Sequence, residues 1–200
     1  METLAANVFV GVEEVTANRD ARVLRQRDML VKGEGAVVSF TVNTPGPVKD
    51  THDARVIFHA GLEAVAKRAA ALGWNILETQ IVTPVTGPEA LLRIAIPGTS
   101  ADAPVIVKMS TVTIEETHAL GRLFDFDILS PEGSPISRTA QGVSSRSCFV
   151  CGQRAVICAR SRAHPLEELL ACISRMVADY TAGLPDPTHT PSGTVEPPRS

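Results

Sequence analysis

The stretch RVIFHAGLEAVAKRAAAL, residues 55–72, decides the fold. Its larger apolar residues recur every three or four positions and share one face of a helix, while charged residues occupy another face. The apolar positions are Phe58, Leu62, Val65, Ala69 and Leu72. Gly73 follows and is a typical helix stop. A helix with a single apolar face needs a partner layer, and the flanking segments indicate a sheet.

Runs rich in β-branched and aromatic residues flank this helix and predict strands. One run, Ala36–Val42, precedes the helix, and proline or glycine separates the runs that follow it. The later runs cover residues 76–83, 90–96, 105–114 and 123–130. We therefore expect an α+β fold in which helices pack on a mixed, mostly antiparallel sheet.

Two further helices are predicted near the ends of the chain. Residues 12–31 are rich in helix-favouring residues, and residues 165–180 are amphipathic, with Pro165 suited to the first helical position. The apolar stripe of the second helix is Leu166, Leu169, Leu170, Ile173, Val177 and Tyr180. Residues 183–200 are rich in proline and threonine and predict a disordered tail. We expect a single domain over residues 1–182, followed by that tail.

Composition narrows the classes of function. The 200 residues carry 19 Lys and Arg against 22 Asp and Glu, a net charge of −3, whereas nucleic-acid binders usually have a basic excess. No apolar run of about 18 residues and no basic leader occurs, so neither a membrane span nor a secretory signal is expected. The motifs G-x-x-x-x-G-K-[ST], G-x-G-x-x-G and G-x-S-x-G are absent. The cysteines are clustered rather than spread as a disulfide framework, which favours the reducing cytoplasm.

Two aspartates in the segment GRLFDFDIL, residues 121–129, are candidates for catalysis. Residues two apart face the same side of a strand, so Asp125 and Asp127 project together while the hydrophobic residues around them face the core. Neighbouring carboxylates repel unless a cation lies between them, and their oxygens suit Mg²⁺. The alternative is a pair of aspartates on a solvated strand face. Weaker candidates for a third metal ligand or a general base precede the pair: Glu115, Glu116 and His118.

The segment from Ser134 to Leu166 is basic and contains no acidic residue. Its arginines are Arg138, Arg146, Arg154, Arg160 and Arg162. Guanidinium groups bind phosphate oxygens in a bidentate manner, so a polyphosphate substrate is a natural partner. Some of these arginines are expected instead to be surface residues paired with acids elsewhere in the chain.

The same segment carries the spacing Cys148-x2-Cys151-x6-Cys158-x5-His164. Three thiols and an imidazole can form a tetrahedral Zn²⁺ site in which the CxxC turn supplies two of the four ligands. Free, partly buried thiols or a redox-active CxxC are alternatives. Cys172 lies within the last predicted helix and is expected to be a core residue.

These segments together resemble the apo-citrate lyase phosphoribosyl-dephospho-CoA transferases, also called citrate lyase holo-[acyl-carrier-protein] synthases. The resemblance runs from about residue 19 to 173. Its anchors, in order, are NTPGPVK (43–49), GPEA (87–90), EETHALGRLFDFD (115–127), ISR (136–138), RSCFVC (146–151) and CARSRAH (158–164). The departures are conservative: Ala119 replaces a common proline, and Phe126 a branched aliphatic residue. The segment around Asp125 also resembles the glycine-plus-DxD signature of polymerase-β-type nucleotidyltransferases, although their usual Gly-Ser is absent.

The resemblance implies an enzyme of nucleotidyltransferase type that builds the prosthetic group of citrate lyase. The donor would be 2'-(5''-triphosphoribosyl)-3'-dephospho-CoA, the acceptor a serine of the apo acyl-carrier subunit, and the second product diphosphate. Asp125 and Asp127 would then hold Mg²⁺ against the triphosphate. The candidates to bind the phosphates of the donor are Lys49, Arg122, Arg138, Arg146, Arg160 and Arg162.

Three alternatives remain open at this stage. The same chemistry can serve another acceptor, such as the carrier subunit of malonate decarboxylase. A non-catalytic, zinc-stabilised adaptor could dock an acidic carrier protein through its arginines. A redox protein could work through Cys148 and Cys151, and it would not need the two aspartates.

Overall fold

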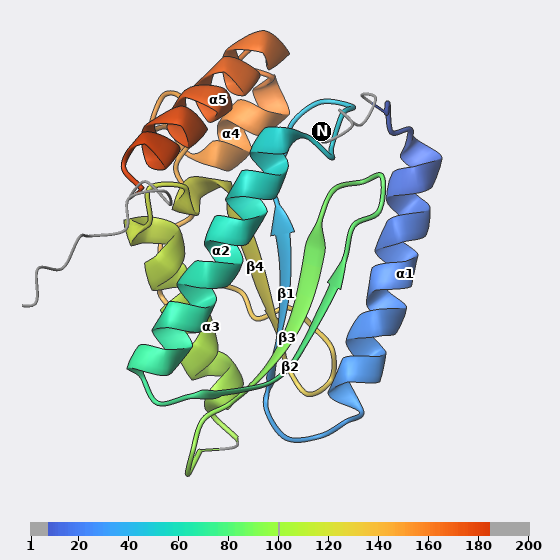
Figure 1. The fold of residues 1–200 in the computed structure, drawn as a ribbon, viewed down its shortest axis with the longest axis vertical. Helices are drawn as coiled ribbons and strands as arrows, with labels where there is room; N and C mark the ends of the chain where they lie inside the picture. Colours follow the sequence, from blue (N-terminus) through green and yellow to red (C-terminus); the bar gives the residue numbers. More distant parts are fainter. Residues whose placement is uncertain (1–7, 100, 185–200) are drawn as a thin grey trace, which may run out of the picture.

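Four strands form one sheet in the computed structural model, which describes residues 8–99 and 101–184 (Figure 1). The order is β2-β3-β1-β4, and every pair is antiparallel. The strands are β1 (Ala36–Val42), β2 (Asn75–Val82), β3 (Glu89–Ala95) and β4 (Phe124–Leu129). The helices are α1 (Val12–Leu30), α2 (His52–Ala71), α3 (Ala103–Thr117), the 3-10 turn η1 (Gly121–Leu123), α4 (Ala155–Ser161) and α5 (Leu166–Ala182). The α+β prediction is confirmed.

The main core lies between one face of the sheet and helices α2, α3 and α5. Phe40 of the central strand β1 is fully buried and stacks on Phe58 of α2, with 5.3 Å between ring centroids, and on Phe126 of β4 at 4.4 Å. Gly61 of α2 faces the Phe40 ring so closely that a β-carbon there would overlap it. The predicted amphipathic helix packs on the sheet, but Leu72 of its predicted apolar face is the C-cap and is 41% exposed. The helix also begins earlier, where the Thr51 side chain accepts a hydrogen bond from the Ala54 N–H.

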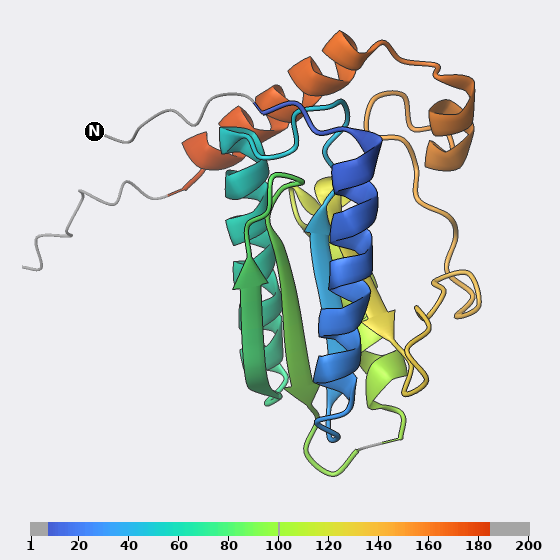
Figure 2. The same ribbon diagram turned by 90° about the vertical axis from the view of Figure 1, so that its right-hand side faces the viewer.

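The opposite face of the sheet carries a smaller core and most of the polar strand residues. Helix α1 runs alongside the strands (Figure 2) and contributes Met29 to a cluster with Val37, Leu91 and Leu129. Toward the N-terminus of α1, polar side chains contact the strands, and Gln26 Nε2 donates to Ser39 Oγ at 2.9 Å. The polar residues of β1 and β4 on this face, Ser39, Thr41, Asp125 and Asp127, lie toward the end of the sheet where β1 ends and β4 begins.

The prediction of a strand over residues 105–114 is wrong, because this segment lies within helix α3. Its β-branched residues suggested a strand, but Val107, Thr111 and Ile114 are spaced by four and three and are all buried on one side of the helix. Pro104 lies between the predicted strands 90–96 and 105–114 and suggested a break between them. It lies in the first turn of α3, where a missing N–H costs no helical hydrogen bond.

The C-terminal part differs from the prediction in detail. Pro165 is the N-cap of α5 rather than its first residue, and Leu166 and Leu170 are each 40% exposed, so only the later part of the predicted stripe is buried. The seven-residue helix α4 was not predicted. The predicted disordered tail lies outside the described residues except for Gly183 and Leu184. Within the described ranges, no helix combines the length and apolarity needed to cross a membrane.

Candidate active site

A cleft of about 180 Å³ lies at the end of the sheet where β1 ends and β3 and β4 begin. The end of β1 with the residues that follow it (41–44) and the loop residues 86–88 form much of its wall. Charged side chains of both signs complete the lining, namely Arg22, Lys49, Glu89 and Asp125. The cleft is therefore suited to a charged ligand rather than an apolar one.

Asp125 and Asp127 project from the same face of β4, as predicted. The residues that alternate with them, including Phe124 and Phe126, are fully buried in the main core. Their partners across the ladder are Thr41 and Ser39 of β1. Partial desolvation, followed by the negative charge of Asp125, raises the pKa of Asp127. The two carboxylates are therefore close enough to repel each other.

Arg146 connects Asp125 to a buried carboxylate. Its Nη1 lies 3.1 Å from Asp125 Oδ1, and its Nη2 lies 2.5 Å from Glu115 Oε1. Glu115 is only 1% exposed, and its Oε1 also accepts from the Phe126 N–H at 3.2 Å. Burial raises the pKa of Glu115, while the charges of Arg146 and Lys108 oppose that shift. The carboxylate thus anchors a cation beside the aspartate pair.

Lys108 of α3 approaches the same strand from the same side as Glu115. Its side chain is buried, and Nζ donates to the backbone carbonyl of Phe126 at 2.8 Å. Burial lowers the pKa of Lys108, and the charges of Glu115, Asp127 and Asp125 counteract that effect. One helix therefore satisfies both the N–H and the C=O of Phe126, and it brings a second cation near the aspartates.

Three arginines, Arg122, Arg138 and Arg146, surround Glu115, and we call them the arginine cluster. Arg138 lies 3.7 Å from Glu115 Oε2 and 2.6 Å from Glu116 Oε1. Burial, followed by the charges of Arg146 and Arg138, lowers the pKa of Arg122. Among the described residues, Nε of Arg122 and Nε of Arg138 are buried without a hydrogen-bond partner, whereas Nη1 of Arg138 is the atom that forms the ion pair with Glu115 Oε2. Unpaired guanidinium donors in a buried cationic cluster favour an anionic ligand.

A second buried carboxylate, that of Glu89, lies on the cleft side of the site. Glu89, at the start of β3, accepts from Arg22 Nε at 2.5 Å and from Arg25 Nη2 at 3.2 Å, both on α1. Asn18 Nδ2 also donates to Glu89 Oε1 at 2.5 Å. Since the Glu89 side chain is only 5% exposed, this network fixes α1 to the sheet and aims Arg22 into the cleft.

The remaining predicted phosphate ligands fall into two groups. Lys49 lines the cleft with Asp125, its Nζ donates to the Thr44 carbonyl at 2.5 Å, and burial lowers its pKa. Arg160, near the end of α4, and Arg162, its C-cap, are exposed. Within the described ranges, no ion pair links either of them to the aspartates. The role of Arg160 and Arg162 in phosphate binding stays a prediction.

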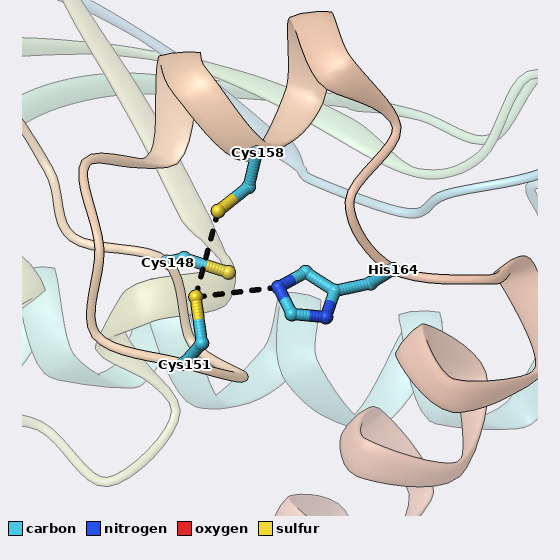
Figure 3. Close-up of side chains that lie close together, drawn as sticks. All are labelled: Cys148, Cys151, Cys158 and His164. Atoms are coloured by element: carbon cyan, nitrogen blue, oxygen red, sulfur yellow. Dashed lines mark hydrogen bonds between the residues drawn. The ribbon is translucent and has the colours of Figure 1, made fainter.

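Cys148, Cys151, Cys158 and His164 converge next to this site, and we call them the Cys3His cluster (Figure 3). Their ligand atoms all lie within 4.8 Å of one another. A backbone N–H of Gln153 and the side chain of His164 lower the pKa of Cys151 to about 7. Cys172 lies on α5 and is only half-buried, outside the buried core, so the prediction of a core residue is wrong.

Two of the residues at the site were missed by the sequence analysis. Lys108 lies in the segment that was predicted to be a strand, so its position beside β4 was hidden. Arg22 was part of a predicted helix, but nothing in the spacing indicated that this helix would cover the polar end of the sheet. Glu115 was only a weaker candidate for a metal ligand or base, whereas the structure surrounds it with cations.

Comparisons with known proteins identify the family of the chain. A family model described as apo-citrate lyase phosphoribosyl-dephospho-CoA transferase matches residues 10–180. A protein of that name from Escherichia coli O139:H28 is 38% identical over 179 residues, which cover 90% of this chain and 94% of the relative. A protein of the same name from Shigella boydii serotype 18 has the same identity and coverage. The match spans both the cleft and the Cys3His cluster. The chain therefore belongs to the apo-citrate lyase phosphoribosyl-dephospho-CoA transferase family.

Proposed function

We propose that this chain transfers phosphoribosyl-dephospho-CoA from the triphosphoribosyl donor to a serine of the apo acyl-carrier subunit of citrate lyase. The serine oxygen forms a bond to the ribose-linked phosphorus. The bond from that phosphorus to the bridging oxygen of the next phosphate breaks, diphosphate leaves with the electron pair of that bond, and the serine proton is released to solvent. Family membership over residues 10–180 carries the proposal, and the charge distribution around Asp125 supports it. The free thiols of the described residues favour the cytoplasm as the compartment.

The aspartate pair suits a divalent cation. Asp125 lines the cleft, and Asp127 follows it on the same face of β4, so two hard oxygen ligands lie next to each other at the edge of the space where a donor phosphate would lie. When bound there, Mg²⁺ would neutralise charge on the triphosphate. Arg146 holds Asp125 in place from one side and thereby limits its rotation.

The cationic side chains bind and orient the donor in this proposal. Lys49 and Arg22 line the cleft together with Asp125, and Arg146 of the arginine cluster contacts Asp125 directly. The unpaired donors of Arg122 and Arg138 provide hydrogen bonds that phosphate oxygens can accept. Because charge builds up on the departing diphosphate, fixed cations at this position stabilise the transition state more than the ground state.

The proposal is tested by mass spectrometry of purified apo-carrier incubated with the protein, the triphosphoribosyl donor and Mg²⁺. We expect a mass gain equal to the phosphoribosyl-dephospho-CoA group, its loss when Mg²⁺ is omitted without a chelator, and its return when Mg²⁺ is added. Asp125→Asn should reduce the initial rate by about a hundredfold or more, since it removes charge from the reacting centre. Asp28→Asn, an exposed change on α1, is the matched control and should retain the rate.

Parallel assays separate the alternatives. Faster labelling of the malonate decarboxylase carrier than of the citrate lyase carrier would contradict the proposed acceptor. Binding of carrier without any mass gain would favour the non-catalytic adaptor. If Cys151→Ser abolished activity while Asp125→Asn left it intact, the redox alternative would replace the proposal.

A further inference from the structure

The Cys3His cluster lies outside the aspartate site and has no assigned role. We propose that Cys148, Cys151, Cys158 and His164 bind one Zn²⁺ ion, and that this ion fixes the segment that carries Arg146. The proposal rests on the geometry of the four side chains and on the poor packing of α4. It goes beyond the transfer reaction, because a zinc site of this kind would exist whichever carrier is the acceptor.

The distances between the ligand atoms match the edges of a coordination tetrahedron. Cys151 Sγ lies 3.5 Å from Cys158 Sγ and 3.3 Å from His164 Nε2. A tetrahedral zinc with Zn–S bonds of about 2.3 Å requires sulfur atoms about 3.8 Å apart. All four atoms point toward one common position (Figure 3), and none is more than 4.8 Å from another. A small adjustment of side chains is enough to place an ion at the centre.

The surrounding contacts hold the ligands in the orientation that zinc needs. The other ring nitrogen of His164, Nδ1, lies 3.2 Å from Glu168 Oε2, and a carboxylate at this position commonly orients a metal-bound imidazole. The Val150 N–H donates to Cys148 Sγ at 3.5 Å, which helps to fix the direction of this side chain. Gly152 adopts a positive φ of 74°, which allows the tight turn after Cys151.

The packing of α4 supports a structural ion. This helix has seven residues and none of them is buried, and Val156 and Ile157 are 41% and 49% exposed. So short a helix is unstable without tertiary contacts. Cys158 lies within it, and His164 lies just before α5, so an ion would join both helices to the CxxC turn. Four protein ligands leave no open coordination position, which indicates a structural rather than a catalytic zinc.

The cluster is directly connected to the candidate active site. Arg146 precedes the first cysteine by two residues, and its carbonyl accepts from the Ala155 N–H at 2.9 Å. Ser147 and Arg154 form an isolated antiparallel bridge, so the turn that bears Cys148 and Cys151 is closed by backbone contacts at Arg146. Loss of the ion would loosen this turn and displace the guanidinium group that contacts Asp125 and Glu115.

The first test is metal analysis of the reduced, full-length protein. We expect about one zinc per chain by mass spectrometry, and Co²⁺ substitution should give the charge-transfer and d–d absorption of a tetrahedral thiolate site. Cys158→Ser should lose most of the zinc, whereas Cys172→Ser on α5 should keep it. A wild-type protein that takes up no zinc, that holds iron instead, or that contains a Cys151–Cys158 disulfide would overturn the assignment.

The second test addresses the effect on Arg146. Removal of zinc with a chelator, followed by addition of excess Mg²⁺, should increase hydrogen exchange in residues 146–164 while strands β1 to β4 keep their protection. Unchanged exchange in residues 146–164 after loss of zinc would refute the positioning role. Neither measurement uses the transfer reaction, so a failure of the proposed function would leave these results interpretable.

Discussion

Arg146 Nη2 lies 2.5 Å from Glu115 Oε1, although 31 residues separate the two in the chain. The other terminal nitrogen of the same guanidinium group, Nη1, donates to Asp125 Oδ1 at 3.1 Å. A loop residue is thereby fixed between a buried helix carboxylate and the strand that bears the aspartate pair. Four predictions concern this contact and the residues near it.

Arg146→Lys should impair transfer with little effect on the fold. A lysine carries the charge but cannot contact two carboxylates with separate nitrogens. Since a charged hydrogen bond contributes about 1.5–3 kcal/mol, kcat/KM should fall by about tenfold to a hundredfold. The measurement is steady-state labelling of the carrier, with Arg175→Lys on the exposed side of α5 as the control. Equal rates for the two variants would show that the bridging contact has no catalytic effect.

Glu115→Gln should destabilise the protein strongly. The variant keeps an acceptor for the Phe126 N–H but leaves Arg146 and Arg138 without their buried counter-charge. Loss of one partner from a buried ion pair costs about 3–5 kcal/mol in the free energy of unfolding. The neighbouring Glu116→Gln removes a carboxylate that is 49% exposed and should cost less than about 1 kcal/mol. Urea unfolding measures both, and similar midpoints for the two variants would contradict the role given to Glu115.

Gly121→Ala should lower stability by disturbing the junction between α3 and β4. A β-carbon at Gly121 would lie 2.5 Å from the Glu115 carbonyl oxygen, and a backbone atom cannot yield as a side chain can. Overpacking of this kind costs about 1–3 kcal/mol in the free energy of unfolding. Gly183→Ala is the control, because a β-carbon there meets no atom closer than 3.6 Å. Thermal unfolding of both variants tests the difference.

His118 should make stability depend on pH below neutrality. Burial lowers its pKa below the ordinary 6.5, although the nearby charge of Glu63 opposes this shift and that of Lys67 assists it. The unfolded chain therefore takes up the proton first as the pH falls. The free energy of unfolding should decrease as the pH drops below about 6.5, and this loss should end below the lowered pKa.

The histidine variants show whether His118 causes that decrease. His118→Asn should flatten the dependence of unfolding free energy on pH between neutrality and mild acid. His59→Asn changes an exposed histidine on α2 and should leave the dependence as in the wild type. A wild-type slope in the His118→Asn protein would assign the effect to another group. In the structure, His118 Nδ1 accepts from the Leu120 N–H, which also requires the neutral ring.

The sequence predicted those features that depend on local pattern. Alternation in β4 was sufficient to place Asp125 and Asp127 on one face, because the fully buried Phe124 and Phe126 allow only one orientation of the strand. Spacing alone indicated the Cys3His cluster, since a turn and a short helix bring such residues together. Amphipathic spacing in the same way predicted α2.

Features that depend on contacts distant in the chain were not predictable. The β-branched residues of α3 favour strands locally, and only packing against β4 decides for the helix. Because residues 105–114 were predicted to form a strand, the position of Lys108 beside β4 was not expected. The partnership of Arg146 with Glu115 depends on the path of the loop after β4, for which the sequence gives no periodic signal. The acid-free segment correctly indicated excess cations, but not that Arg138 and Arg146 would share one buried acid.

The outer edge of β4 has a consequence for how a protein substrate can approach. Strand β4 is the last strand of the sheet, yet the amide and carbonyl of Phe126 are already occupied by Glu115 and Lys108. An incoming polypeptide cannot extend the sheet there by backbone pairing, which is otherwise a common mode of peptide capture. Under the proposed function, the part of the carrier that bears the acceptor serine would therefore reach this site without backbone pairing to Phe126, and the same contacts disfavour self-association at this position of the edge.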